Sequence, residues 1–311
     1  MALKILLTGG AGYIGTSLIP LLLMQGHKVR VLDKLVYGGE SLVPYFIEPN
    51  FEFIRGDILD ERTVRDALRG VDVVVHLAAI VGYPACKKNP QLAFDVNVTG
   101  TEVVGRNLEK GQVVIFASTG SNYGAIVGQV CTEETPVNPL TIYGETKTKA
   151  EQFLLERCDA IAFRFATAFG LSPRLRLDLL INDFVYQALK RKNLIVYEKT
   201  FKRTFIHVRD IARAFLFALD NVDRMVHNVY NVGSDGMNYS KEEIAQLIKQ
   251  KIDFYLHFAD VGTDEDQRNY EVSYRKLNAL GYTTTIGIEN GIDELIRGLQ
   301  LIDVRNPYSN V

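Results

Sequence analysis

The sequence of 311 residues is 47% hydrophobic and 23% charged, a composition typical of a globular chain large enough for two domains. Its 35 Lys and Arg side chains nearly balance 37 Asp and Glu side chains, which argues against a nucleic-acid partner held through its phosphates. The three Cys residues lie far apart and outside metal-ligand spacing, and no apolar run reaches the roughly 18 residues that span a bilayer. We therefore predict a reduced, cytoplasmic protein with no metal site, no membrane association and a small ligand.

The first half of the chain alternates short apolar runs with longer stretches at helical spacing. Strands are predicted over Lys4–Leu7, Lys28–Leu32, Phe51–Ile54, Val71–Leu77, Gln112–Ala117 and Ala160–Phe165. Helices are predicted over Gly12–Met24, Glu61–Leu68, Leu92–Leu108 and Thr146–Cys158. Because strands joined by helices need right-handed crossovers, this alternation predicts an α/β fold with a doubly wound parallel sheet of the Rossmann type.

After Gly170 this alternation breaks, although helical and strand-like segments continue. They are Leu171–Lys190 (a loop and a helix), Leu194–Tyr197, Ile211–Leu219, Val229–Val232, Lys241–Lys251 and Gly291–Ile302. No Pro- or Gly-rich linker divides the chain, so we predict a nucleotide-binding domain over residues 1–168 with a return segment at about 204–234. A smaller, interleaved substrate domain is expected in the rest of residues 169–311. The cleft between two such domains is a usual place for a small-molecule site.

A glycine-rich loop follows the first predicted strand and opens the first helix. Gly9 allows the tight turn, Gly12 lets the backbone approach a pyrophosphate, and Gly15 allows the helix to pack closely on the strand. Tyr13 and Ile14 complete the loop, and the phosphates would lie at the positive end of the helix. This motif predicts a dinucleotide site, since its position after a strand makes a ligand-free turn the weaker interpretation.

Two carboxylates follow the next strands. Asp33 ends the second strand, eighteen residues after Gly15, where it can accept hydrogen bonds from the adenosine ribose and repel a 2′-phosphate. This position favours NAD over NADP, although Lys34 could soften the choice. Asp57, followed by Ile58, comes after the third strand and is placed to meet the adenine amino group, or to cap a helix.

Tyr143 and Lys147 lie four residues apart at the start of a predicted helix, so their side chains share one face. A neighbouring ammonium favours the tyrosinate, which can take a proton from a sugar hydroxyl while a hydride leaves the same carbon. Thr119 and Ser121 follow an apolar strand, at the edge of the sheet where such folds place their chemistry. Thr119 could share a hydrogen bond with the reacting oxygen, with Ser121 as a further contact.

These motifs together resemble those of extended short-chain dehydrogenases/reductases of the NAD-dependent nucleotide-sugar epimerase and dehydratase family, in particular UDP-glucose 4-epimerases. The resemblance covers Thr8–Gly15, Asp33, Asp57, 77–79, 97–101, 118–124, 143–147 and 204–210. It implies NAD as cofactor, a nucleotide-sugar substrate, and a catalytic triad of Thr119, Tyr143 and Lys147. The nicotinamide side of the cleft would be formed by Leu77, Ala78, Ala79 and Asn97.

The family pattern also implies where the substrate binds. Arg203 matches an arginine that grips the sugar-nucleotide diphosphate, and Arg268 resembles a second one, in keeping with the bidentate pairing of guanidinium with phosphate. Arg174 and Arg176 could serve the diphosphate or simply flank a helix start. Further predicted substrate contacts are Val81, Ser121 and Thr167.

Three departures from the family pattern narrow the predicted activity. Dehydratases of the family carry Asp-Glu after the catalytic threonine, whereas Gly120 and Ser121 stand here and cannot transfer protons, so 4,6-dehydration is disfavoured. Thr167 replaces the Asn of many epimerases, which alters one sugar or diphosphate contact. The segment 171–184 is similar to a branch that contains GDP-heptose C4-dehydrogenases of capsule synthesis.

The expected activity is oxidation of a sugar hydroxyl, at C4, by hydride transfer to NAD with Tyr143 as base. If the ketone accepts the hydride on its other face, the enzyme is an epimerase; if a GDP-sugar ketone leaves, it is a C4-dehydrogenase. A catalytically silent dinucleotide-binding regulator is the alternative from a different class. The resemblance also implies a homodimer through the helices at 92–108 and 147–158, whose apolar stripes could equally pack on the sheet.

Overall fold

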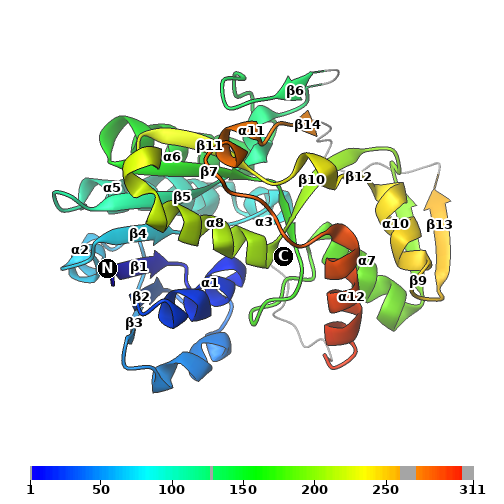
Figure 1. Cartoon of the computed structure of the whole chain (residues 1–311), viewed down its shortest axis with the longest axis horizontal. Coiled ribbons are helices and arrows are strands. Elements are labelled where there is room, and N and C mark those ends of the chain that lie inside the picture. Colours follow the sequence, from blue (N-terminus) through cyan, green and yellow to red (C-terminus); the bar gives the residue numbers. More distant parts are fainter. Residues whose placement is uncertain (1, 127–128, 260–270, 303–311) are drawn as a thin grey trace.

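The computed structural model describes residues 2–126, 129–259 and 271–302. Seven parallel strands form the main sheet in the order β11-β7-β5-β4-β1-β2-β3 (Figure 1). Their bounds are β1 (Lys4–Thr8), β2 (Lys28–Asp33), β3 (Phe51–Arg55), β4 (Val73–His76), β5 (Val113–Thr119), β7 (Ala160–Phe165) and β11 (Asn228–Val232). Because the chain runs outward from β1 in one direction and then from β4 in the other, the predicted doubly wound α/β sheet is confirmed.

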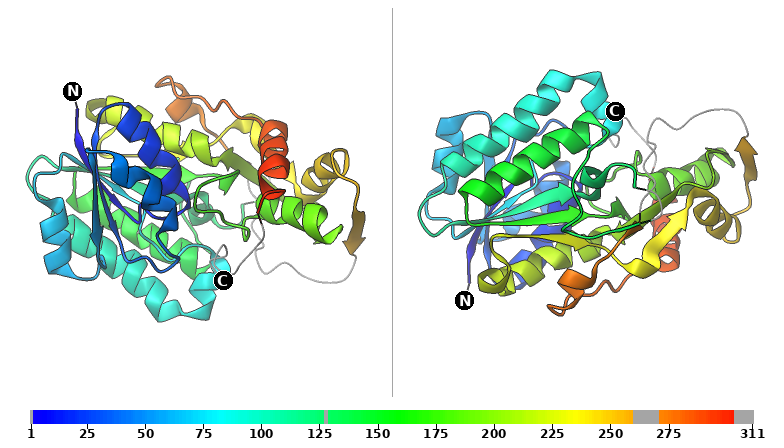
Figure 2. Two further views of the ribbon diagram at one scale, coloured as in Figure 1. Left: turned by 90° about the horizontal axis from the view of Figure 1, so that it is seen from below. Right: turned by 90° about the horizontal axis from the view of Figure 1, so that it is seen from above.

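Helices cover both faces of this sheet (Figure 2). Along β1 the side chains alternate, with Ile5 and Leu7 in the apolar cluster under one face and Leu6 in the cluster under the other. The first cluster includes side chains of α1 (Tyr13–Met24) and α8 (Val208–Asp220). The second includes side chains of α2 (Glu61–Leu68), α5 (Gly100–Arg106) and α6 (Ile142–Arg157). Burial on both faces explains why the strands are continuously apolar in sequence.

The later part of the chain forms a second, smaller group of elements beside the sheet (Figure 1). Its strands are β8 (Thr167–Phe169), β9 (Asn193–Tyr197), β10 (Lys202–His207), β12 (Asn238–Ser240) and β13 (Tyr255–Ala259). Its helices are α7 (Leu180–Tyr186), the π-helical turn Gln187–Arg191, α10 (Lys241–Lys249) and α12 (Ile288–Leu299). These elements share an apolar cluster of their own, whereas β11 returns to the main sheet. The exact division into two domains stays a prediction.

Several short elements have no counterpart among the predicted ones. They are η1 (Glu40–Ile47), α3 (Tyr83–Lys88), η3 (Gly120–Tyr123), β6 (Val130–Cys131), α9 (Val222–Met225), η5 (Asp235–Met237), β14 (Glu271–Val272) and α11 (Arg275–Asn278). The predicted helix at 92–108 is divided into α4 (Pro90–Phe94), a π-helical turn at Asp95–Thr99, and α5. Sequence periodicity does not reveal such a turn, because it shifts the register by one residue without ending the helix.

Candidate active site

One cleft runs along the carboxyl ends of the sheet strands and extends to the loop after β8. Most of the predicted site residues line it: Gly9, Gly12, Tyr13, Ile14, Gly15, Asp33, Lys34, Asp57, Ile58, Leu77, Ala78, Ala79, Val81, Thr119, Tyr143, Lys147, Thr167, Arg174 and Arg176. Residues predicted for the cofactor, the chemistry and the substrate therefore share one continuous cavity. This is the position in which open α/β sheets bind their ligands.

Three of the predicted residues that the structure describes do not line the cleft. Asn97 is buried behind its wall, where its side chain accepts a hydrogen bond from Ile80 N (2.7 Å) and donates to Ile80 O (3.0 Å). Ser121 is buried beneath the turn that carries Thr119, and Arg203 is buried on β10. Arg268 lies outside the described residues. Asn97 thus holds the backbone of the cleft residue Ile80, and Ser121 is hydrogen-bonded to Thr119.

The glycine loop has the tight geometry that its predicted role requires. Gly9 has a φ of 70°, and a Cβ there would lie 2.6 Å from Ala78 N. A Cβ on Gly15 would lie 2.4 Å from Gly10 O, so only glycine lets α1 approach the loop this closely. Gly12 occupies the N-cap of α1, and no described side chain caps this helix end. Its first N–H groups are therefore available to an anion such as a pyrophosphate.

Asp33 is held in position by two backbone groups. Its carboxylate accepts hydrogen bonds from Ala11 N (3.0 Å) and Leu35 N (2.7 Å). Burial raises the pKa of this carboxyl, and the two hydrogen bonds oppose that rise. Lys34 turns aside to form an ion pair with Asp57 (Nζ–Oδ2, 2.7 Å). Lys34 is therefore paired with Asp57 and not with Asp33. The Asp33 carboxylate can then favour a ribose without a 2′-phosphate.

Tyr143 and Lys147 project from the first two turns of α6, whose N-cap is Thr141. Lys147 is 3% exposed, and its Nζ lies 3.9 Å from the centroid of the Phe116 ring. Burial lowers the pKa of Lys147 to about 7, and the nearby Glu151 partly opposes this shift. The lysine can therefore change its protonation state near neutral pH, which suits a group that supports proton transfer.

Thr119 stands at the end of β5, opposite Tyr143 in the lining of the cleft. Its hydroxyl lies 3.1 Å from Ser121 Oγ and accepts a hydrogen bond from Ser121 N (3.2 Å). Gly120 completes the turn, so the positions after Thr119 carry no carboxylate. The turn offers hydroxyl groups for orientation and no acid or base of its own.

A buried ion pair beneath this turn was not anticipated from the sequence. Glu151, one turn beyond Lys147 on α6, accepts hydrogen bonds from Ser118 Oγ (2.5 Å) and Asn122 Nδ2 (3.1 Å). Arg164 of β7 approaches the same carboxylate to 2.6 Å, and both charged side chains are less than 10% exposed. The pair thus joins α6 to both ends of the turn around Thr119. Four-residue spacing of Tyr143, Lys147 and Glu151 is the signal that could have found it.

Tyr37 is a second cleft residue that sequence reasoning missed. It follows β2 in a loop without a strong motif, and the guanidinium of Arg174 lies 4.6 Å from its ring centroid. Only the folded chain brings these two residues together, because they are far apart in sequence.

No group of three or more metal-ligating side chains occurs within residues 2–126, 129–259 and 271–302. In the same part of the chain, none of the helices combines the length and the apolar character that crossing a membrane requires.

Comparison with known proteins agrees with this geometry. A sequence profile described as the NAD-dependent epimerase/dehydratase family matches residues 5–233. The chain belongs to this family. This membership confirms the predicted family resemblance. It also confirms NAD as the predicted cofactor, because the family is NAD-dependent.

Three similar proteins show how far the likeness extends. A putative UDP-glucose 4-epimerase from Methanocaldococcus jannaschii is 28% identical over 95% of this chain and 98% of its own length. UDP-glucuronic acid decarboxylase 1 from Xenopus tropicalis is 29% identical over 94% of this chain and 71% of its own. The crystal structure of Thermus thermophilus UDP-glucose 4-epimerase with NAD has 25% identity and a TM-score of 0.85, over 96% of this chain and 99% of that one.

Proposed function

We propose that the protein is an NAD-dependent nucleotide-sugar epimerase that oxidises a sugar hydroxyl at C4 and then reduces the ketone on its other face. The observation that carries this proposal is that one continuous cleft is lined both by the glycine loop and Asp33 and by Thr119, Tyr143 and Lys147. Similar proteins are named as an epimerase and a decarboxylase of UDP-sugars and a dTDP-glucose 4,6-dehydratase, which supports a nucleotide sugar as substrate.

The residues at the adenosine end fit NAD. The open N-terminus of α1 would hold the pyrophosphate, and Asp33 would accept hydrogen bonds from the ribose hydroxyls. Leu77, Ala78 and Ala79 would form the wall on the nicotinamide side. When bound, NAD supplies the hydride acceptor and later the hydride donor.

Residues of the protein itself would remove the proton of the sugar hydroxyl. Tyr143 would accept it as the C–H hydride departs, so that an alcohol becomes a ketone and charge is conserved. Thr119 would hold the reacting oxygen by a hydrogen bond. Lys147, buried in the same wall, would stabilise the tyrosinate when protonated. In the return step Tyr143 gives the proton back to the oxygen of the epimerised alcohol.

The turn after Thr119 separates this reaction from dehydration. Removing water across two carbons needs an acid and a base beside the 4-keto sugar, and Gly120 and Ser121 provide neither. Release of the 4-keto product, as by a GDP-sugar C4-dehydrogenase, is the competing outcome. Arg203 and Arg176 are the proposed contacts of the sugar-nucleotide half.

A panel of UDP-, GDP-, CDP- and dTDP-sugars, followed by NMR, tests the proposal. We expect one of them to be converted to its C4 epimer without net formation of NADH. Accumulation of a 4-keto sugar with NADH would support the dehydrogenase instead. Absence of turnover with every nucleotide sugar would refute both, and Tyr143→Phe with wild-type turnover would refute the role of Tyr143.

A further inference from the structure

The loop that follows β8 is hydrogen-bonded to the start of the glycine-loop helix. We call residues 170–176 the strap. Tyr13 OH donates to Gly170 O (2.7 Å), and Ser172 Oγ donates to Tyr13 O (2.7 Å). The hydroxyls of Thr16 and Ser172 lie 2.9 Å apart, and Arg174 N donates to Thr16 Oγ1 (3.3 Å). The strap is therefore joined to the first turn of α1, where the pyrophosphate is expected.

The opposite side of the strap is fixed by α7. Asn182 is fully buried, and its Oδ1 accepts a hydrogen bond from Gly170 N (2.9 Å). Its Nδ2 donates to Gly170 O (3.2 Å) and to Arg176 O (2.8 Å). Because one amide satisfies backbone groups at both ends of the strap, the strap is a defined structure rather than a free loop.

The two arginines of the strap lie toward different parts of the cleft. Arg174 is 5% exposed, stacks against Tyr37 and interacts electrostatically with Asp33, the ribose carboxylate. Arg176 forms an ion pair with Asp178 (Nε–Oδ1, 3.2 Å), and its Nη2 lies 3.9 Å from where a Cβ on Gly82 would be. Both guanidinium groups interact electrostatically with Tyr37, but Arg174 is the one that stacks on its ring and acts on Asp33, whereas Arg176 also acts on Tyr143.

We propose that the strap closes the adenosine end of the cleft over NAD, and that Arg174 binds the cofactor rather than the sugar nucleotide. This proposal rests on the NAD site of the proposed function. The backbone N–H of Arg174 is bonded to Thr16 in the first turn of α1, and its buried guanidinium lies near Tyr37 and Asp33. A guanidinium so close to the glycine loop suits a phosphate of the cofactor, since planar charged donors pair well with phosphate oxygens. Release of the cofactor would require breaking the bonds between the strap and α1. A cofactor retained in this way returns its hydride to the sugar that supplied it.

The rate of NADH release tests this directly and needs no substrate. Enzyme loaded with NADH is mixed with excess NAD, and the fluorescence of bound NADH is followed. Thr16→Val and Ser172→Ala, which remove hydroxyls that join the strap to α1, should each speed release about 2- to 10-fold, because one hydrogen bond contributes about 0.5–1.5 kcal/mol. Arg174→Ala should speed it about tenfold or more. Arg69→Ala, an arginine that is 75% exposed on its side chain, serves as the matched control and should leave the rate unchanged.

A second measurement separates the cofactor from the substrate. Arg174→Ala should leave KM for the nucleotide sugar near the wild-type value while NADH release accelerates. Unchanged NADH release with a raised KM would overturn the assignment of Arg174. Release from Thr16→Val and Ser172→Ala at the rate of Arg69→Ala would overturn the strap. The NADH-release rates need no sugar substrate, so failure of the strap proposal and failure of the proposed reaction are distinguishable.

Discussion

At the scale of single residues, Lys147 is the least ordinary group in the cleft, since an ammonium is rarely buried to 3% exposure. Its pKa of about 7 lies far below the value of 10.5 that it has in an unfolded chain. Between these values the unfolded state binds more protons than the folded state, so the free energy of unfolding rises with pH. Below about pH 7 both states are protonated and the burial cost is fully present.

This pKa leads to a stability prediction. Without nucleotides, the free energy of unfolding of the wild type relative to Lys147→Met should increase from about pH 7 to about pH 9. Methionine keeps the apolar stem and has no charge to bury. Urea denaturation of both proteins at the two pH values measures the difference. A difference that does not change with pH would show that Lys147 keeps an ordinary pKa.

Tyr143 is the proton acceptor in the proposed reaction. Loss of its hydroxyl should therefore lower kcat and have little effect on stability. Tyr143→Phe should lower kcat about 100-fold or more, within the range for loss of a general base. Thermal unfolding should show a midpoint close to that of the wild type. Tyr197→Phe, which changes an exposed tyrosine at the end of β9, is the matched control and should keep wild-type kcat.

At the scale of elements, α6 unites three residues at four-residue spacing on the side that faces the sheet. Tyr143 and Lys147 can be predicted as site residues from the sequence, because their pairing is a recognisable motif. Glu151 was overlooked because a lone Glu on a helix is usually solvated. Only the buried partner Arg164, supplied by β7, reveals what it does. Partners brought together by the sheet are the part of the site that spacing along the chain does not disclose.

The buried ion pair should contribute strongly to stability. Glu151→Ala leaves Arg164 charged and buried, and should lower the free energy of unfolding by about 3–5 kcal/mol. Glu61→Ala, which breaks an exposed pair with Arg65 on α2, is the matched control and should cost less than about 1 kcal/mol. Equal losses in urea denaturation would mean that the Glu151 pair is not the link between α6 and the turn.

Gly9 of the glycine loop can be compared with Gly70, which has nearly the same positive φ angle. Gly9 and Gly70 have φ values of 70° and 68°, but a Cβ on Gly70 would meet no atom within 4 Å. Gly70→Ala should therefore cost only the left-handed strain of about 1–2 kcal/mol. Gly9→Ala should cost more and abolish NAD binding, because the new methyl collides with Ala78. Calorimetric titration with NAD, alongside denaturation, measures both effects, and NAD binding by Gly9→Ala would contradict this account.

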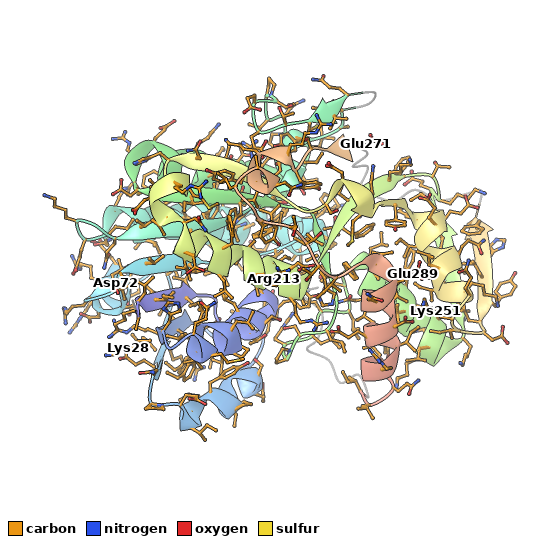
Figure 3. All side chains as sticks on the ribbon, viewed as in Figure 1. Lys28, Asp72, Arg213, Lys251, Glu271 and Glu289 are labelled. Carbon is orange, nitrogen blue, oxygen red and sulfur yellow. The ribbon has the colours of Figure 1, made fainter. Side chains whose placement is uncertain are left out.

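At the scale of the whole molecule, the near balance of charge reflects mixed signs spread over the surface. In Figure 3 the exposed residues Lys28, Asp72, Lys251, Glu271 and Glu289 lie in separate parts of the fold. Two charged side chains of the proposed site, Lys147 and Arg174, are buried within the cleft wall. A formal net charge of −2 is therefore compatible with binding two phosphorylated ligands.

The first part of the chain was the more predictable one, because continuous strands and a glycine loop are strong local signals. In the later part, β8 and β12 are only three residues long and both pair with β10, which is distant in sequence, so no local pattern marks them. The strap illustrates the same limit. Ser172 and Arg174 are ordinary loop residues until the fold carries them to Thr16, more than 150 residues earlier.

In the proposed reaction, a hydride leaves C4 of the nucleotide sugar for NAD and returns to the same carbon within one cleft. The most direct measurement uses the accepted nucleotide sugar with deuterium at C4 and follows the product by NMR. We predict an epimer that keeps its deuterium at C4, with no labelled NADH in solution. An epimer that has lost the label to solvent, or a ketone accompanied by free deuterated NADH, would contradict the claim.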